Sequence, residues 1–285
     1  MDQKIISLFD KYTHGGMSRR DFLDKLGQAA GSATAALALL PLLENNYAQA
    51  AVVPENDPRL QITTVEIAPG IKGLIALPKA ATGKLPCVLV IHENRGLNPH
   101  IQDIVRRIAL EGYLAFGPDY LTAAGGTPNN EDTERDLIGK LTPAEILSTS
   151  KAAASALRGH ERSNGKVAAI GFCWGGSQVN ALAVADPELA AGVAYYGQQP
   201  TGDDVAKIRA PLLLHYAGLD DRINAGIKDF EAALKANNKT YELYVYEGVN
   251  HAFNNDTNPA RYDKPAADLA WGRSMAFLKK YTTAG

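Results

Sequence analysis

Short apolar runs alternate with amphipathic helical patterns from about residue 73 to residue 280, and this alternation restricts the chain to few architectures. Two of the runs, residues 73–77 and 87–91, are aliphatic and are each bordered by a proline. Apolar runs of this length fit strands that are buried on both faces. The segment 101–111, in contrast, places its apolar residues at helical spacing. Strands that alternate with helices predict an α/β fold with a mostly parallel sheet and helices on both faces.

The same alternation continues to the C-terminus. Further strands are expected at residues 114–116, 167–172, 191–196, 212–216 and 241–246, and further helices at residues 142–158, 177–185, 227–237 and 266–280. Residues 122–141 are polar and contain several Gly, Pro and Asn residues, and we interpret this long connection as a flap over a site. No internal repeat or linker interrupts the pattern, so residues 51–285 are predicted to form a single domain.

The first fifty residues are of a different kind. They contain S-R-R-D-F-L at 18–23, an uncharged apolar run at 27–43 and A-Q-A at 48–50. A charged segment, an apolar stretch and a small-x-small pattern are the three parts of an export signal. The paired arginines resemble those of a Tat leader. We therefore predict that residues 1–50 are a Tat-type signal peptide, that the Tat export machinery is a partner and that the mature chain is periplasmic.

A retained N-terminal helix packed on the domain is the alternative, and it would leave the protein in the cytoplasm. In its favour, a long segment containing Asp2 and Asp10 precedes Ser18, which is unusual for a leader. A membrane anchor is not expected, because the apolar run contains Pro41 and falls short of the ~20 residues that span a bilayer. The mature chain is thus predicted to have no stable membrane span.

Composition argues against several other classes of protein. The chain has 29 Lys and Arg residues against 31 Asp and Glu residues and no basic block, so nucleic-acid binding is not expected. The two cysteines, Cys87 and Cys173, are too few for a disulfide framework and do not have the spacing of metal ligands. No metal and no cofactor are therefore predicted.

One expected strand runs directly into the sequence G-F-C-W-G, in which Cys173 lies between Gly171 and Gly175. G-x-C-x-G is the pattern of a nucleophile elbow with cysteine as the nucleophile. The turn is tight enough to require glycine at both flanking positions. The N–H groups at the start of the following helix favour a thiolate. By itself the motif also fits a structural or phosphate-binding turn, in which a buried cysteine is a small apolar residue.

Two later loops supply partners for this cysteine. Asp220 follows the last expected strand but one, and His251 follows the last. Nucleophile, acid and base occur in this chain order in the α/β-hydrolase fold, so we predict that fold with a Cys173–Asp220–His251 triad. Asp220 is preferred to Asp221, which stands beside an arginine and suits a solvated ion pair. The other histidines are placed elsewhere, and His14 falls in the leader.

The sequence H-E-N-R-G follows the second apolar run. An oxyanion hole in this fold takes one backbone N–H from the residue after the nucleophile, which is Trp174, and another from this early loop, which we assign to Asn94. The carboxylate of Glu93 is expected to accept a hydrogen bond from the resting thiol of Cys173. The alternative for Glu93 is an ion pair with Arg95 at the loop surface.

These motifs together resemble the dienelactone hydrolase (carboxymethylenebutenolidase) family. The resemblance covers roughly residues 73–280 and rests on HENRGLNPHIQDIVRRIALEGY at 92–113, NGKVAAIGFCWGG at 164–176, AGLDDRI at 217–223 and NHAF at 250–253. It implies a small lactone or ester as substrate. It also implies that Cys173 attacks the carbonyl while Asp220 orients His251, which protonates the departing enolate and then activates water. A family tyrosine near the site corresponds to Tyr195 or Tyr196.

One position departs from the family pattern. Family members are described with an arginine four residues after the catalytic histidine, where it holds a carboxylate of the substrate, and here that position is Asn255. A second such arginine would come from the flap, where Arg135 is available. Substrate contacts are therefore predicted from Arg95, from the two tyrosines and from Asn255. A preference for carboxylated substrates is not expected.

Two other functions remain open at this point: a broader carboxylester or thioester hydrolase of the same fold, and a redox protein that uses Cys173 as a reactive thiol. A redox role calls for a resolving cysteine nearby. Cys87 should begin its strand whereas Cys173 follows the end of another, which separates them by roughly 13 Å at the strand rise. A disulfide needs Cα atoms within about 7 Å of each other. Both thiols are therefore predicted to be free, which favours the hydrolase.

Overall fold

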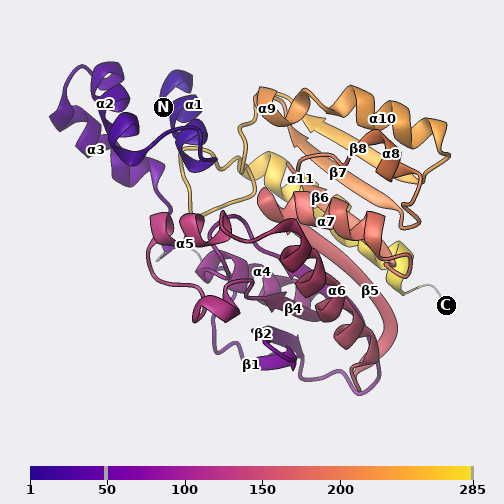
Figure 1. Cartoon of the computed structure of the whole chain (residues 1–285). Helices are drawn as coiled ribbons and strands as arrows, with labels where there is room; N and C mark the ends of the chain where they lie inside the picture. Colours follow the sequence, from indigo (N-terminus) through magenta and orange to yellow (C-terminus); the bar gives the residue numbers. More distant parts are fainter. Residues whose placement is uncertain (48–50, 284–285) are drawn as a thin grey trace.

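The computed structural model describes residues 1–47 and 51–283 and is built around an eight-stranded sheet (Figure 1). The strands are β1 (Leu60–Ala68), β2 (Ile71–Pro78), β3 (Leu85–Ile91), β4 (Leu114–Pro118), β5 (Ser163–Phe172), β6 (Ala191–Tyr195), β7 (Leu212–Ala217) and β8 (Tyr241–Tyr246). They lie in the order β1-β2-β4-β3-β5-β6-β7-β8. Pairing is antiparallel from β1 through β2 to β4 and parallel across the rest of the sheet. The predicted mostly parallel α/β fold is confirmed.

Helices cover both faces of this sheet. One face carries α4 (Pro99–Leu110) and α11 (Lys264–Thr282), and the other carries α6 (Pro143–Gly159), α7 (Trp174–Ala185) and α10 (Ile227–Ala236). Short elements fill the connections: η2 (Thr122–Ala124), α5 (Glu131–Ile138), α8 (Gly202–Val205) and α9 (Asp221–Asn224). Each face of the sheet therefore has its own hydrophobic core.

Strand β3 shows why the central strands are uninterrupted apolar runs in the sequence. Val88 and Val90 belong to the core beneath α4 and α11, whereas Leu89 and Ile91 belong to the core on the opposite face. All four side chains are fully buried. A strand with no solvent face has no position that favours a polar residue.

The edge strand β1 is an element that the sequence did not predict. Its residues L-Q-I-T-T-V-E-I-A alternate between apolar and polar, and several of them are exposed. The strand lies at the edge of the sheet and pairs with β2 alone. Polar residues that reach the solvent separate the apolar residues of β1, so the strand contains no continuous apolar run.

Two glycines fix the turn between β5 and α7. A Cβ atom added to Gly171 would lie 2.2 Å from the carbonyl oxygen of Gly175, and one added to Gly175 would lie 2.3 Å from the carbonyl oxygen of Ile91. Such distances are far inside van der Waals contact. The requirement for glycine on both sides of Cys173, predicted from the motif, is confirmed.

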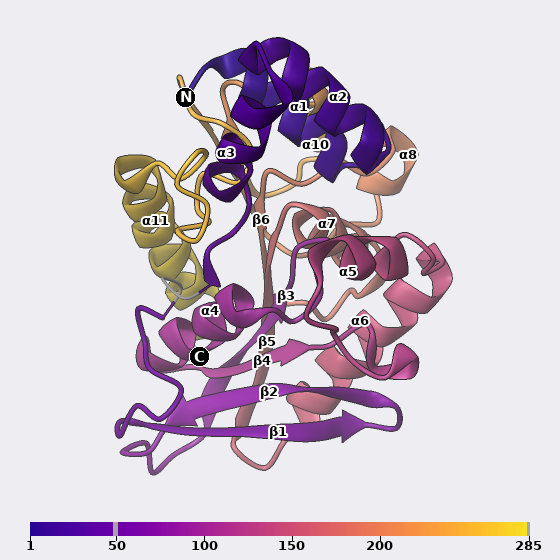
Figure 2. The ribbon, with the colours of Figure 1, turned by 90° about the vertical axis from the view of Figure 1, so that its left-hand side faces the viewer.

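The N-terminal helices α1 (Gln3–Thr13), α2 (Arg19–Ala30) and α3 (Ala33–Leu43) form a small unit with its own apolar core. Figure 2 shows them gathered at one end of the molecule, with β1 and β2 at the other. Within the described residues no single helix is long and apolar enough to cross a membrane; α2 and α3 would suffice together, but they are bent by 110° at their junction. The predicted cleavage pattern at 48–50 lies outside the described residues.

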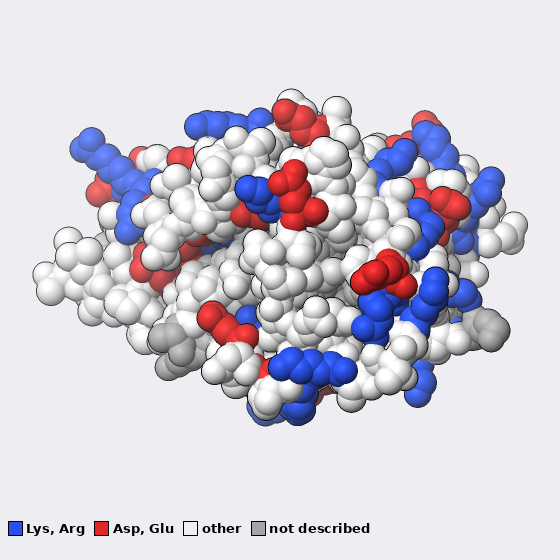
Figure 3. Space-filling model, turned by 90° about the horizontal axis from the view of Figure 1, so that it is seen from below, with Lys and Arg blue, Asp and Glu red and all other residues white. Residues whose placement is uncertain are grey.

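Charged side chains are mixed on the surface. On the face seen in Figure 3, Lys and Arg residues alternate with Asp and Glu residues in small groups. This mixture corresponds to the near balance of 29 basic and 31 acidic residues in the whole chain.

Candidate active site

Cys173 lies at the junction of β5 and α7, where the backbone is strained. Its φ of 56° and ψ of −116° are unusual for a residue with a side chain. The tight turn holds this conformation and places the cysteine directly before the first turn of α7. The side chain is buried, with 8% of the residue exposed. Strained geometry of this kind is typical of a nucleophile that is displayed at the end of a strand.

The loops after β7 and β8 bring a carboxylate and an imidazole to the same place. His251 Nδ1 lies 2.5 Å from Asp220 Oδ2, and both side chains are buried. Asp220 also accepts a hydrogen bond from the backbone N–H of Ile223 through its second oxygen, at 3.3 Å, which fixes the carboxylate. A ring nitrogen of His251 lies within 4.8 Å of the sulfur of Cys173. The structure thus brings together the three residues predicted as the triad.

The protonation states follow from this geometry. Burial alone would raise the pKa of the Cys173 thiol, but His251 and His14 outweigh it and lower the pKa to about 6. Burial would lower the pKa of His251, whereas the Cys173 sulfur and the Asp220 carboxylate raise it to about 10. Between these values the site holds a thiolate and an imidazolium.

His14 is a site residue that sequence reasoning missed. Its Nε2 lies 3.3 Å from the sulfur of Cys173, and its ring meets the ring of His251 edge-on with 4.7 Å between centroids. The prediction placed His14 in a leader, away from the site. No local pattern could have revealed the contact, because it joins residues 159 positions apart in the chain.

The structure corrects the role predicted for Glu93. Its Oε2 accepts a hydrogen bond from Asn255 Nδ2 at 2.9 Å, while the sulfur of Cys173 is in contact with His14. The alternative ion pair is not formed either, because Arg95 Nε pairs with Glu131 at 3.0 Å. Asn255 stands four residues after His251, at the position of the arginine described for the family, and its side-chain amide donates to Glu93.

The prediction that Asn255 binds substrate is corrected for the same reason. Its side-chain oxygen accepts hydrogen bonds from the N–H and the hydroxyl of Thr257, and its Nδ2 donates to Glu93. The residue is fully buried. Asn255 therefore supports the wall of the site, and its polar atoms are already paired within the protein.

Of the two candidate tyrosines, Tyr196 faces the site. It lines the main cavity, and its ring lies 4.8 Å from that of His251. Its buried hydroxyl has no hydrogen-bond partner within the described part of the chain. Tyr195 instead makes a hydrogen bond of 2.7 Å with the hydroxyl of Ser274 in the core, so its predicted substrate contact is corrected.

Trp174 and Asn94, the predicted oxyanion residues, both line the cavity beside Cys173. Trp174 is the first residue of α7, and the first N–H groups of a helix have no partner within the helix. The side chain of Asn94 donates to the carbonyl oxygen of Thr13 at 2.8 Å. Their backbone N–H groups stay predictions for the oxyanion hole.

The cavity over Cys173 has a volume of about 540 Å³. Its walls come from the end of α1, from α5 and the residues after it, from the start of α7 and from α9. The segment 122–141, which was interpreted as a flap, thus supplies one wall through residues 135–140. The cavity is large enough for a small ester or lactone.

The arginines near the cavity are engaged with carboxylates. Arg135 lines the cavity and pairs with Asp132 at 3.0 Å. Arg261, which the sequence analysis did not select, is buried and lies in a recess shared with Cys173 and Arg95. Its guanidinium is 3.7 Å from Asp10. Because Arg261 stands ten positions after the histidine and outside every recognised motif, the sequence offered no signal for it.

The site also contains three side chains that could act as metal ligands, those of His14, Cys173 and His251. Their ligand atoms lie within 4.8 Å of one another, and among the described residues this is the one such group. The surroundings do not suit a dication. The guanidiniums of Arg95 and Arg261 are buried next to the cysteine, and their positive charges oppose metal binding. The donor set is better explained as a thiolate held by two imidazoles.

A cysteine at a strained strand–helix turn, with a histidine–aspartate pair from the two following strand ends, defines an α/β-hydrolase-fold enzyme. A family model described as the dienelactone hydrolase family matches residues 71–282, and the chain belongs to that family. The resemblance seen in the sequence is confirmed. A second family model, described as YqhI-like, matches residues 1–31.

Two curated relatives each match about three quarters of this chain. A protein from Escherichia coli O157:H7 named as a carboxymethylenebutenolidase is 35% identical over 221 residues, which are 72% of this chain and 81% of that protein. One of the same name from Saccharolobus solfataricus is 32% identical over 74% of this chain and 94% of its own length. A crystal structure described as a dienelactone hydrolase from Klebsiella pneumoniae has a TM-score of 0.71 and 32% identity, covering 78% of this chain and 99% of its own.

The ion pair at the site predicts an unusually acidic thiol. Alkylation of Cys173 by iodoacetamide, followed against pH, should have its midpoint near 6, well below the ~8.5 of a free cysteine, since the thiolate is the reacting form. The Cys173→Ala variant provides the background, because burial raises the pKa of the remaining Cys87 thiol. A midpoint at pH 8 or above would contradict the thiolate–imidazolium pair.

Proposed function

We propose that this enzyme of the dienelactone hydrolase family hydrolyses small lactones or carboxylic esters through an acyl-enzyme on Cys173. The observation that carries the proposal is the placement of a buried cysteine at the elbow within 4.8 Å of an imidazole that is itself held by Asp220. A cysteine is activated as a nucleophile by a lowered pKa and an adjacent base. The cavity above the sulfur provides the space for the acyl group.

Acylation begins with the thiolate. The sulfur of Cys173 attacks the carbonyl carbon of the substrate, a carbon–sulfur bond forms, and the electron pair of the carbonyl moves onto its oxygen. We assign the stabilisation of this oxyanion to the N–H of Trp174, because the first N–H groups of a helix such as α7 have no partner within the helix. When the tetrahedral intermediate collapses, the carbon–oxygen bond to the leaving group breaks. The departing enolate or alkoxide takes the proton of the His251 imidazolium.

Deacylation runs through the same groups. Neutral His251 takes a proton from a water molecule, and the resulting hydroxide attacks the thioester carbon. Collapse of the second tetrahedral intermediate breaks the carbon–sulfur bond and returns the thiolate of Cys173 and the imidazolium of His251. Asp220 keeps the imidazole in one orientation and one tautomer throughout, because its carboxylate accepts the Nδ1–H at 2.5 Å.

The redox alternative has little support from the cysteine positions. Cys87 is paired in register with Val167 on the neighbouring strand, and Cys173 lies beyond the far end of that strand. Both cysteines are free, as predicted. Cys87 directs its thiol to the hydroxyl of Ser163 at 3.1 Å, away from the site.

The arginines around the cavity are already paired with carboxylates of the protein, and this pairing favours neutral substrates. Arg95 and Arg135 each pair with a carboxylate from α5, and Arg261 pairs with Asp10. Lys140 and Arg222 also line the cavity but are exposed, and exposed charges contribute little to a specific ion pair. Among the residues that the structure describes, a substrate carboxylate therefore lacks the dedicated buried partner that an arginine at position 255 would supply.

Export through the Tat machinery stays an untested prediction from the sequence, and it competes with retention of the N-terminal helices. A leader that ends at residue 50 would place residues 51–285 in the periplasm. Retention of the N-terminal helices is favoured by their packing, because their apolar residues Phe9, Phe22 and Leu26 are buried in a core of their own. The contact between His14 and Cys173 favours retention further.

The proposed chemistry is tested by a panel of esters and lactones run on the full-length chain and on Cys173→Ala. The wild type should turn over several members, and the variant should lose at least ~1,000-fold in kcat/KM because the covalent route is removed. Cys87→Ala is the matched control and should keep the wild-type rate. Full activity of Cys173→Ala would overturn the assignment of the nucleophile.

Substrate charge is tested by comparing a carboxylated lactone with its methyl ester. We expect the neutral ester to be hydrolysed at least as efficiently, since Arg95, Arg135 and Arg261 are all paired with carboxylates of the protein. A preference for the free acid above ~100-fold in kcat/KM, or about 2.7 kcal/mol, would show that one of the arginines changes partners when substrate binds. Arg261→Ala and Arg135→Ala would then identify which one.

A further inference from the structure

The end of helix α1 lies directly on the nucleophile. His14 follows the last residue of the helix, and its Nε2 is 3.3 Å from the sulfur of Cys173. The other ring nitrogen, Nδ1, lies 2.7 Å from the carbonyl oxygen and 3.3 Å from the carboxylate of Asp10. A ring whose Nδ1–H is accepted in this way is held in one orientation, with Nε2 toward the sulfur.

This environment favours a charged imidazole at His14. The C-terminal end of a helix carries a partial negative charge that stabilises a cation placed there. Burial alone would lower the pKa of His14, but the Cys173 sulfur and Asp10 raise it above the ordinary value. His14 can therefore donate an Nε2–H to the thiolate as an imidazolium.

Several other charged groups face this pair. They are Asp10 from α1, Glu93 and Arg95 from the loop after β3, Asp220 and Arg222 from the segment after β7, and His251 and Arg261 from the segment after β8. The carboxylates of Asp10 and Asp220 each hold one of the two imidazoles that face the sulfur. His14 and His251 thus each have an aspartate beside Nδ1, and their rings meet edge-on.

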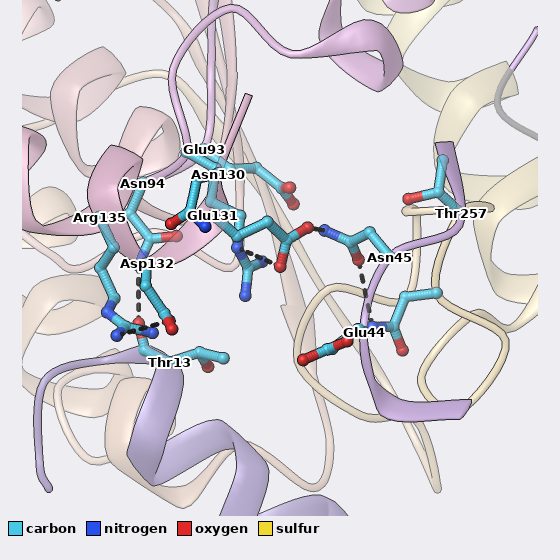
Figure 4. A network of polar contacts seen from close by, with 12 residues as sticks. Thr13, Glu44, Asn45, Glu93, Asn94, Asn130, Glu131, Asp132, Arg135 and Thr257 are labelled. Carbon is cyan, nitrogen blue, oxygen red and sulfur yellow. Dashed lines mark hydrogen bonds and ion pairs between the residues drawn. The ribbon is translucent and has the colours of Figure 1, made fainter. Parts of the chain in front are cut away.

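Polar contacts fix the N-terminal helices to the domain at this point. The side chain of Asn94 donates to the carbonyl oxygen of Thr13, and Asn45 donates to Glu131 at 2.9 Å (Figure 4). Arg19 of the twin-arginine pair donates to Asp132 at 2.6 Å. These contacts join the N-terminal segment to the loop after β3 and to α5, the two elements that border the cavity.

The N-terminal segment also completes the cavity. Thr13, His14 and Gly15 line it next to Trp174 and Tyr196. Removal of this wall would open the space above Cys173 to solvent and would leave the sulfur with one imidazole. The dienelactone hydrolase model matches from residue 71 onward, so this wall lies outside the part of the chain that the family defines. The YqhI-like match over residues 1–31 includes it.

We propose that residues 1–47 are retained in the active enzyme and that His14 is a site residue that holds the thiolate of Cys173. This inference rests on the proposed function, in which Cys173 is the nucleophile. At rest the Nε2–H of His14 donates to the thiolate of Cys173, whereas the sequence had suggested Glu93 as the acceptor for a neutral thiol. His14 keeps its proton when the sulfur attacks, and His251 transfers the proton to the leaving group.

The proposal is tested on the full-length chain with the variant His14→Ala. The matched control is Lys25→Ala, which changes an exposed residue of α2. The midpoint of Cys173 alkylation should rise by about one pH unit in His14→Ala, which lowers the rate at pH 6 about fivefold. The acidic limb of the kcat/KM profile should move by the same amount. Lys25→Ala should retain the wild-type midpoint.

Asp10→Asn is a second variant, which keeps the shape of the side chain and weakens the hold on His14. It should move the alkylation midpoint in the same direction by a smaller amount. An unchanged alkylation midpoint in both variants would overturn the role of His14. A rise in the activity of His14→Ala would also overturn it, because the N-terminal segment would then inhibit the enzyme. Alkylation reports on the thiol whether or not a substrate is turned over, so this result is separate from a failure of the proposed hydrolysis.

The retention of the segment is tested by the intact mass of the active protein isolated from its natural host. The mass should include residues 1–47. An active form that begins after residue 50 would overturn the proposal and would support the export leader.

Discussion

The stabilisation of a buried thiolate is the interaction on which the site depends. A sulfur anion that is removed from water loses its hydration, and this cost must be offset by charges close to it. In this enzyme the offset comes from His251, held by Asp220, and from His14, held by Asp10. The strained backbone of Cys173 fixes the sulfur between them, and glycines on both sides of the turn allow that backbone.

The fold explains how groups from distant parts of the chain reach one point. The parallel strands β5, β7 and β8 end at the same edge of the sheet, and the residues that follow them carry the cysteine, the aspartate and the histidine. The loop after β3 adds Glu93 and Asn94 at that edge. The N-terminal helices then pack over the open side and supply an imidazole that the sheet does not provide.

Much of this arrangement could be predicted from the sequence, because its signals are local. The buried strands are continuous apolar runs, the elbow requires two glycines, and chain order identifies the acid and the base. Predictions failed where a residue's partner is distant in the chain. His14 and Cys173, which are in contact, lie 159 positions apart in the chain. The carboxylate of Glu93 accepts a hydrogen bond from Asn255, which is 162 positions away.

The direction of individual side chains was the second feature that could not be predicted from the sequence. Tyr195 is the last residue of β6, and Tyr196 follows it with a positive φ of 38°. The hydroxyl of Tyr195 meets Ser274 in the core, whereas Tyr196 lines the cavity. The sequence does not say which of them lines the cavity, since both are aromatic and both are buried. The apolar stretch of α3 has the composition of a leader and also that of a helix that packs in a small core, so composition alone could not separate these two outcomes.

The covalent intermediate proposed on Cys173 can be tested for directly. Full-length enzyme is mixed with an excess of a small activated ester, quenched in acid during turnover, digested and analysed by mass spectrometry. The peptide that contains Cys173 should carry one acyl group, and the adduct should disappear once the substrate is consumed. Rapid turnover with an unmodified Cys173, or with the acyl group on the neighbouring Ser177 that also lines the cavity, would contradict catalysis by the thiolate.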